Sequence, residues 1–434
     1  MPPLSLSGLL RLALPAMVFT VLTHGYRAVD HYWIQDVGTS AQAAIGSSVF
    51  VLILFAACFE LVAAGAAPLV ARATGAGDPD LRRAVIGSAI VAAVGVAGGL
   101  MVVGGLGADH LALALGLSGD TATQAATYLR TIALTILPLA LTPLVDQCFV
   151  AMGDTRKPMA LQALSLGLNV VLTPVLIHTA GLGILGAALA SNGSRLVATS
   201  LGLWLLVRTV GLRREDLAPT QVRRVLRIGA PLSIGTVTYA LVYWALLYVA
   251  ISPLGPHVNA ALGIGFSALE GFTWPAFWGV AMAVSSFVGR YLGAGRPDQA
   301  RAAMRLAFPV LTVLGLMAAG AFYWGGRALT GFFTRDPAVH EAATQYAMIL
   351  SFSQVFVAWE ALTEGVLAGA GDTRTIFWRS LGPNVLRVPL AWALAIPLGF
   401  GAAGIWWAIN LTTVVKACWK GHAAWSGRWE RLEV

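Results

Sequence analysis

Six carboxylic acids fall inside long apolar stretches of the sequence, where an ionised side chain is most costly. They are Asp30, Glu60, Asp146, Glu270, Glu360 and Glu364. A charge at membrane depth costs roughly 3 kcal/mol or more unless it is paired or faces water, so such residues are functional candidates by default. The chemistry that they could perform is the binding of protons or cations.

Asp30 lies in the first apolar stretch, with Arg27 one helical turn before it. Two interpretations are open. The two side chains could form a local ion pair that tethers the helix. Alternatively, a carboxylate in a cavity of low dielectric constant takes up a proton more readily and can carry it. We favour the second interpretation.

The second half of the chain holds the other prominent acids. Glu360 and Glu364 are four residues apart on one helix face, so they would repel each other if both were ionised, and one could hold a proton. Glu270 lies beside Trp274 and Trp278, whose aromatic faces attract cations by roughly 0.5–2 kcal/mol. This group predicts an organic-cation site, although the tryptophans could also only pack against lipid.

Twelve of the fourteen tryptophans follow residue 218, so we place substrate contacts in the second half. Arg195 and Arg387, each near the centre of an apolar stretch, are expected to neutralise some of the acids.

The elements that position these residues are transmembrane helices. Of 434 residues, 57% are apolar and only 11% are charged, against about a quarter in soluble domains. Apolar stretches of about 20 residues, enough to cross a bilayer, run almost end to end. We predict twelve spans, near 8–34, 42–71, 84–107, 123–150, 158–178, 183–207, 228–252, 258–289, 302–325, 339–370, 376–398 and 402–425.

The net charge of +8 is spread over short loops between spans, which indicates topology and not nucleic-acid binding. The loops after even-numbered spans and the two tails account for 22 of the 28 Lys and Arg residues. Only Arg327 and Arg335 are assigned to the opposite side, and Arg27, Arg130, Arg195 and Arg387 to spans. Both termini are therefore predicted to be cytoplasmic.

Known catalytic patterns are missing from the sequence. It contains no phosphate-binding Gly-Lys loop, no paired-His zinc helix and no strained serine elbow. The three cysteines lack metal-ligand spacing. We expect no cofactor, no metal centre and no enzymatic activity.

The chain repeats itself at a shift of 218 residues. Gly75-Ala76-Gly77 recurs as Gly293-Ala294-Gly295, and Gly153-Asp154-Thr155-Arg156 recurs as Gly371-Asp372-Thr373-Arg374. Six spans per half place both halves in the same orientation, so the repeats are parallel. We predict an N-lobe at 1–208, a cytoplasmic linker at 209–227 and a C-lobe at 228–434.

These motifs, with Leu14-Pro15 and Val29-Asp30 in the first span, resemble the multidrug and toxic compound extrusion (MATE) family over nearly the whole chain. The resemblance implies a V-shaped, all-α membrane fold of twelve helices. It also implies an antiporter that exports organic cations and other small amphipathic drugs in exchange for protons or sodium.

The family's first-lobe ion site is matched by Asp30, by Asn169 and by Ser191. The pattern departs at Thr173, where many members carry an acid. In the sodium-coupled branch, an acid of span seven is expected near Tyr239, which cannot supply a carboxylate. Glu360 or Glu364 could stand in for the acid of span ten. We therefore predict coupling to protons.

A lipid-linked precursor flippase of the same superfamily is the alternative. It would need a cationic cavity for phosphate, and four span arginines against six acids argue against it. We expect a monomer in the plasma (inner) membrane of a prokaryote, with the lipid bilayer as its surroundings.

Overall fold

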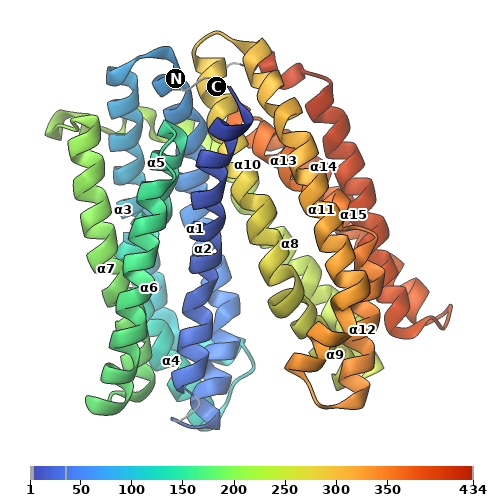
Figure 1. Cartoon of the computed structure of the whole chain (residues 1–434). Coiled ribbons are helices and arrows are strands. Elements are labelled where there is room, and N and C mark those ends of the chain that lie inside the picture. Colours follow the sequence, from blue (N-terminus) through green and yellow to red (C-terminus); the bar gives the residue numbers. More distant parts are fainter. Residues whose placement is uncertain (1–3, 35–36, 433–434) are drawn as a thin grey trace. The chain divides into compact units, whose positions relative to one another are not determined.

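The computed structural model describes residues 4–34 and 37–432, apart from a few side chains within helices, Arg27, Asp30 and His31 among them. All regular structure in these ranges is helical. The first-half helices are α1 (Leu6–Ile34), α2 (Thr39–Ala76), α3 (Pro79–Ala114), α4 (Gly119–Leu134), α5 (Leu137–Met152), α6 (Arg156–Pro174) and α7 (Gly183–Val210). Those of the second half are α8 (Val222–Leu246), α9 (Pro256–Ile264), α10 (Glu270–Gly293), α11 (Pro297–Phe333), α12 (Pro337–Ser351), α13 (Gln354–Ala370), α14 (Thr373–Ala395) and α15 (Gly401–Trp425) (Figure 1).

Seven helices are long and apolar enough to cross a membrane, and nine crossings result if each of two bent pairs counts as one. The bent pairs are α4 with α5, at 55°, and α12 with α13, at 60°. Of the remaining four helices, α7, α14 and α15 have 28, 23 and 25 residues but carry buried polar or charged side chains, and α9, with 9 residues, precedes α10 within the same predicted span. Together these elements match the twelve predicted spans, and the prediction of an all-α membrane protein is confirmed.

Contacts divide the chain into two compact units. The N-terminal unit is Leu22–Ser233, and the C-terminal unit is Ile234–Val434 together with Met1–Val21. The first part of α1 thus belongs with the second half, where Thr20 Oγ1 donates to the Pro275 carbonyl of α10 at 2.9 Å. The first part of α8 belongs with the first half, because a Cβ on Gly229 would lie only 1.8 Å from the Leu61 carbonyl oxygen of α2. The lobe boundaries taken from the sequence remain a prediction.

The repeated motifs end one helix and start the next. Gly77 and Gly295 both have φ of 69°, and Gly153 and Gly371 have φ of 87° and 82°, a left-handed conformation that favours glycine. The aspartates that follow Gly153 and Gly371 accept hydrogen bonds from backbone amides at the starts of α6 and α14. The shared shift therefore reflects a shared pattern of helix ends in both halves.

The linker after α7 is held against α3 within the N-terminal unit. Its Ala218 carbonyl accepts a hydrogen bond from Ser88 Oγ at 2.6 Å, and the Gln221 amide donates to the same hydroxyl at 3.1 Å. Gly87 permits this approach, since a Cβ there would lie 1.9 Å from the Asp216 carbonyl oxygen.

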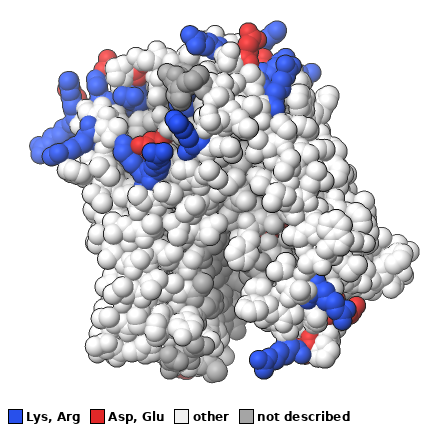
Figure 2. Space-filling view, viewed as in Figure 1, with Lys and Arg blue, Asp and Glu red and all other residues white. Residues whose placement is uncertain are grey.

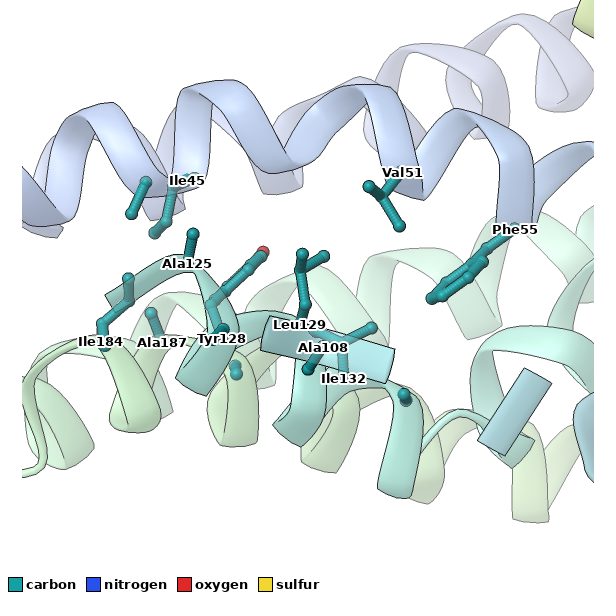
Figure 3. Close-up of a cluster of buried hydrophobic side chains, with 14 of the residues drawn as sticks. Ile45, Val51, Phe55, Ala108, Ala125, Tyr128, Leu129, Ile132, Ile184 and Ala187 are labelled. Carbon is teal, nitrogen blue, oxygen red and sulfur yellow. The ribbon is translucent and has the colours of Figure 1, made fainter. Parts of the chain in front are cut away.

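Each unit has its own apolar core. In the N-terminal unit, side chains of α2, α3, α4 and α7 interdigitate, with Phe55, Leu129 and Ile184 among them (Figure 3). The corresponding cluster of the C-terminal unit surrounds Tyr346 and Trp406. Large apolar side chains also cover the outside: Leu106 is 80% exposed and Trp324 is 82% exposed. A surface of this kind requires lipid as its solvent.

Candidate functional site

The first candidate site lies between α6 and α7 of the N-terminal unit. Asn169 and Thr173 are one turn apart on α6, and Asn169 Nδ2 donates to Ser191 Oγ on α7 at 3.2 Å. All three side chains are fully buried. The structure thus brings together three of the four predicted ion-coupling residues, whereas the side chain of Asp30 lies outside the described residues.

A tyrosine and an arginine lie in the same unit. The Tyr26 hydroxyl donates to Ser165 Oγ, and the Arg195 guanidinium lies over the Tyr26 ring at 3.9 Å from its centroid. Arg195 also donates to the Ser191 carbonyl at 3.4 Å. In the described part of the chain Arg195 contacts this ring and this carbonyl, and its expected role in neutralising an acid remains a prediction, because the side chain of Asp30 lies outside the described residues.

The second candidate site is built around Glu270 at the start of α10. The Tyr346 hydroxyl of α12 donates a hydrogen bond to Glu270 Oε1 at 2.7 Å. The close approach depends on Gly265, where a Cβ would lie 2.4 Å from the Tyr346 ring. Gly265 opens the π-helical turn η6 (Gly265–Leu269) that leads into Glu270, and such turns are frequent at functional sites.

A row of aromatic rings adjoins this turn. Phe266 of η6 packs against Tyr243 of α8 at 5.0 Å between ring centroids, and Tyr243 packs against Tyr239 at 4.7 Å. Trp274 and Trp278 stack on each other at 5.6 Å. Sequence reasoning selected Tyr239 and the two tryptophans but missed Tyr346, which is distant in the chain and carries no charge to mark it.

Arg387 of α14 is fully buried and donates three hydrogen bonds to hydroxyl groups. They go from Nη1 to Tyr243 Oη at 2.9 Å, from Nε to Thr412 Oγ1 at 3.0 Å and from Nη2 to Thr413 Oγ1 at 3.3 Å. No described carboxylate lies within ion-pair distance of this guanidinium. These hydrogen-bond partners are neutral hydroxyl groups, and the expected role of Arg387 in neutralising an acid remains a prediction.

Two lysines of α15 neutralise the acids of α13. Lys416 Nζ lies 2.9 Å from Glu360 Oε1, and Lys420 Nζ lies 3.0 Å from the same oxygen and 2.7 Å from Glu364 Oε2. Both lysines are buried, and both lie inside the predicted span 402–425. Arg11, Arg305 and Arg379 likewise lie inside predicted spans, so the count that placed these five residues outside the spans is wrong, and 22 − 5 = 17 basic residues remain in the loops and tails.

This arrangement also changes the interpretation of Glu360 and Glu364. Their mutual repulsion is offset by the shared ammonium group of Lys420. The signal was present in the sequence. Lys416 and Lys420 share the four-residue spacing of the two glutamates, which places each pair on one helix face.

Twelve crossings in two parallel halves, with polar and charged groups buried at membrane depth in both, define a membrane transporter. The chain belongs to the MatE family, whose model matches residues 15–175 and 210–393. The model of the lipid II flippase MurJ matches a shorter segment, residues 118–255.

A curated relative is the probable multidrug resistance protein NorM of Thermotoga maritima, 24% identical over 98% of this chain and 93% of that protein. Two solved structures share the fold. An outward-facing multidrug resistance MATE transporter superposes with a TM-score of 0.90 at 21% identity, over 98% of this chain and 96% of that one. A MOP-superfamily transporter of Pyrococcus furiosus, described as having a binding pocket of reverse polarity, gives 0.89 at 20% identity, also over 98% and 96%.

Proposed function

We propose that this protein is a secondary antiporter that exports organic cations and cationic amphipathic drugs, driven by protons that enter the cell. Membership of the MatE family supports export, and the relative from Thermotoga maritima is named as a multidrug resistance protein. The observation that carries the substrate class is Glu270. Its carboxylate is oriented by Tyr346 beside the aromatic row Tyr239, Tyr243 and Phe266. A carboxylate next to aromatic faces is suited to a cation with an apolar body.

The test removes the negative charge of the Glu270 side chain while keeping its size and shape. Glu270→Gln should weaken the binding of a cationic dye to the purified protein by about 10-fold, the equivalent of one charge-assisted contact of about 1.4 kcal/mol. Tyr346→Phe, which removes only the orienting hydroxyl, should have a smaller effect in the same direction. Unchanged cation affinity in Glu270→Gln would remove Glu270 from the substrate site.

Coupling to protons is the second part of the proposal. Sodium requires several oxygen ligands, and Tyr239 supplies no carboxylate where the sodium-coupled branch has one. Glu360 and Glu364 are already bound to Lys416 and Lys420, so a sodium ion would have to displace a tethered ammonium group. A proton needs only one carboxylate, and the candidate is Asp30, which the family resemblance groups with Asn169, Thr173 and Ser191.

The alternative is a flippase for lipid-linked precursors. Two observations favour it: the MurJ family model matches residues 118–255, and four buried cations lie in the C-terminal unit, namely Arg290, Arg387, Lys416 and Lys420. Glu270, Glu360 and Glu364 balance three of these charges, which leaves only Arg290, in the last turn of α10, for a pyrophosphate. A liposome assay that scores both drug transport and translocation of a polyprenyl-pyrophosphate-linked sugar separates the two functions.

We further propose that the protein lies in the plasma (inner) membrane as a monomer with both termini in the cytoplasm. Figure 2 shows Lys and Arg of the N-terminal unit gathered at one end, with the flank below it free of charged side chains on the face shown. This end includes the α2–α3 turn and the linker, which carry Arg82, Arg83, Arg213 and Arg214. Basic loops remain on the cytoplasmic side during insertion.

A further inference from the structure

Asp146 is a buried carboxylate to which the function proposed above assigns no role. It lies on α5 in the N-terminal unit, about two turns before the helix ends, and its side chain is only 5% exposed. No described residue forms a hydrogen bond or an ion pair with it. Its burial is therefore not compensated in the way that buried charges normally are.

In the second half of the internal repeat, the acid at the corresponding position has a cationic partner. At the shift of 218 residues, Asp146 corresponds to Glu364, and the position of its partner Lys420 corresponds to Gly202 of α7. Gly202 faces α5, because a Cβ there would lie 3.0 Å from Val145 Cγ1. The same helix pair thus carries an acid and a lysine in one half, and an acid and a glycine in the other.

The next pair of repeat-related positions, one helical turn away, shows the same difference between the two halves. Glu360 and Lys416 correspond to Thr142 and Ala198, which form no ion pair. Thr142 Oγ1 instead lies 2.6 Å from Thr199 Oγ1, a neutral hydrogen bond between α5 and α7. The N-terminal unit has therefore neutral groups at three of these four positions and keeps only the carboxylate of Asp146.

The helices packed against α5 are α2, α3, α6 and α7. The charged or titratable side chains that they carry within the described ranges are Cys58, Glu60, Arg72, Asp80, Arg82, Arg83, Asp109, His110, Arg156, Lys157, Arg195 and Arg208, and α5 itself adds Cys148. Several are engaged elsewhere: Arg83 with Asp216 at 3.7 Å, and Arg208 over the ring of Trp204 at 4.4 Å. None of them forms an ion pair with Asp146 in the described part of the chain.

A buried carboxylate with no cationic partner lowers its free energy by binding a proton, because the neutral acid is far less costly to desolvate. We propose that Asp146 is a proton-binding site of the N-terminal unit, which takes up and releases a proton during transport in addition to Asp30. The role in transport rests on the proposed proton coupling. The occupancy of Asp146 by a proton does not, since it can be measured without transport.

The direct test is infrared difference spectroscopy of the full-length protein in lipid while the pH is raised. The carbonyl stretch of a protonated carboxylic acid should disappear on deprotonation in the wild type. This signal should be missing in Asp146→Asn and retained in Glu364→Gln, the repeat-related control whose acid is already paired. An unchanged signal in Asp146→Asn would overturn the proposal. If that variant does not fold, Asp146→Glu should retain the signal at a shifted frequency, and an identical spectrum would also count against Asp146.

A second measurement tests the role in the cycle. Release of protons on addition of a cationic substrate, followed with a pH dye, should fall in Asp146→Asn while substrate still binds, and should be unchanged in Glu364→Gln. Undiminished proton release in Asp146→Asn would refute a transport role, even if Asp146 is protonated. Failure of proton coupling altogether would appear as no proton release in the wild type, which is a different result.

Discussion

Among individual residues, Lys420 is a buried cation with two acidic partners. Its side chain is 1% exposed, and its ammonium group contacts both Glu360 and Glu364. Removing one partner from a buried ion pair leaves uncompensated charge, which costs roughly 3–5 kcal/mol. Lys420→Met should therefore lower the thermal unfolding midpoint of the protein in detergent more than the same substitution at Lys157, whose side chain is 35% exposed.

The double variant Lys420→Met with Glu364→Gln is the control for this prediction. It removes the charge of Glu364, the carboxylate that Lys420→Met leaves without a partner, whereas Glu360 still pairs with Lys416. The double variant should therefore regain part of the lost stability. A single variant as stable as the wild type would show that the lysine contributes little and that water reaches the two acids.

Residue types and spacing were enough to find the acids at membrane depth, because a carboxylate in an apolar stretch stands out in any reading of the sequence. The family resemblance selected Asn169 and Ser191, which the structure joins by a hydrogen bond. The partners could not be found in the same way. Tyr346, Thr412 and Thr413 are ordinary residues of a helix until tertiary packing brings them to Glu270 or Arg387.

At the scale of helices, the two bent spans are stabilised in the same way. A bend releases backbone carbonyls from the helical hydrogen-bond pattern, and in each unit an asparagine satisfies them. Asn192 of α7 donates to the Ile132 and Thr135 carbonyls where α4 meets α5, and Asn410 of α15 donates to the Ile349 carbonyl where α12 meets α13. Asn192 and Asn410 are related by the same shift of 218 residues.

Close helix contacts at glycine provide an element-scale prediction. Gly229→Ala should push α8 away from α2, since the new Cβ would meet the Leu61 carbonyl oxygen at 1.8 Å. Alanine otherwise stabilises a helix by about 1 kcal/mol relative to glycine. Loss of folded protein in size-exclusion chromatography is therefore the expected result.

Gly235→Ala, six residues further along α8, is the matched control. Its Cβ would meet only Phe377 at 3.7 Å, an ordinary contact, so this variant should be at least as stable as the wild type. Equal behaviour of the two variants would contradict the tight packing of α8 on α2.

At the scale of the whole molecule, the number and order of the spans could be predicted from the sequence, whereas helices such as α2 and α11 extend beyond their predicted limits. Apolar length fixes each crossing, and glycine followed by aspartate marks the turns at Gly153 and Gly371. Two features could not be predicted. The bends in spans four and ten interrupt stretches that are continuously apolar, and the pairing of the α1 and α8 starts with the opposite halves depends on packing between residues far apart in sequence.

The orientation of the chain can be tested with single cysteines in a background lacking Cys58, Cys148 and Cys418. Ser118→Cys, on an exposed turn after α3, should react with a membrane-impermeant thiol reagent added to whole cells. Arg156→Cys, at the exposed start of α6, should react only after the membrane is opened. The reverse labelling pattern would invert the topology.

The central claim is that protons entering the cell drive the export of organic cations. The most direct measurement uses purified protein in liposomes held at one membrane voltage, with either a pH gradient or a sodium gradient imposed. We predict that, without sodium, a fluorescent organic cation moves across the membrane in the direction opposite to the flow of protons. Asp30→Asn should abolish this movement, and Arg27→Ala should retain it. Movement driven by the sodium gradient at equal pH, and absent with the pH gradient alone, would contradict the account.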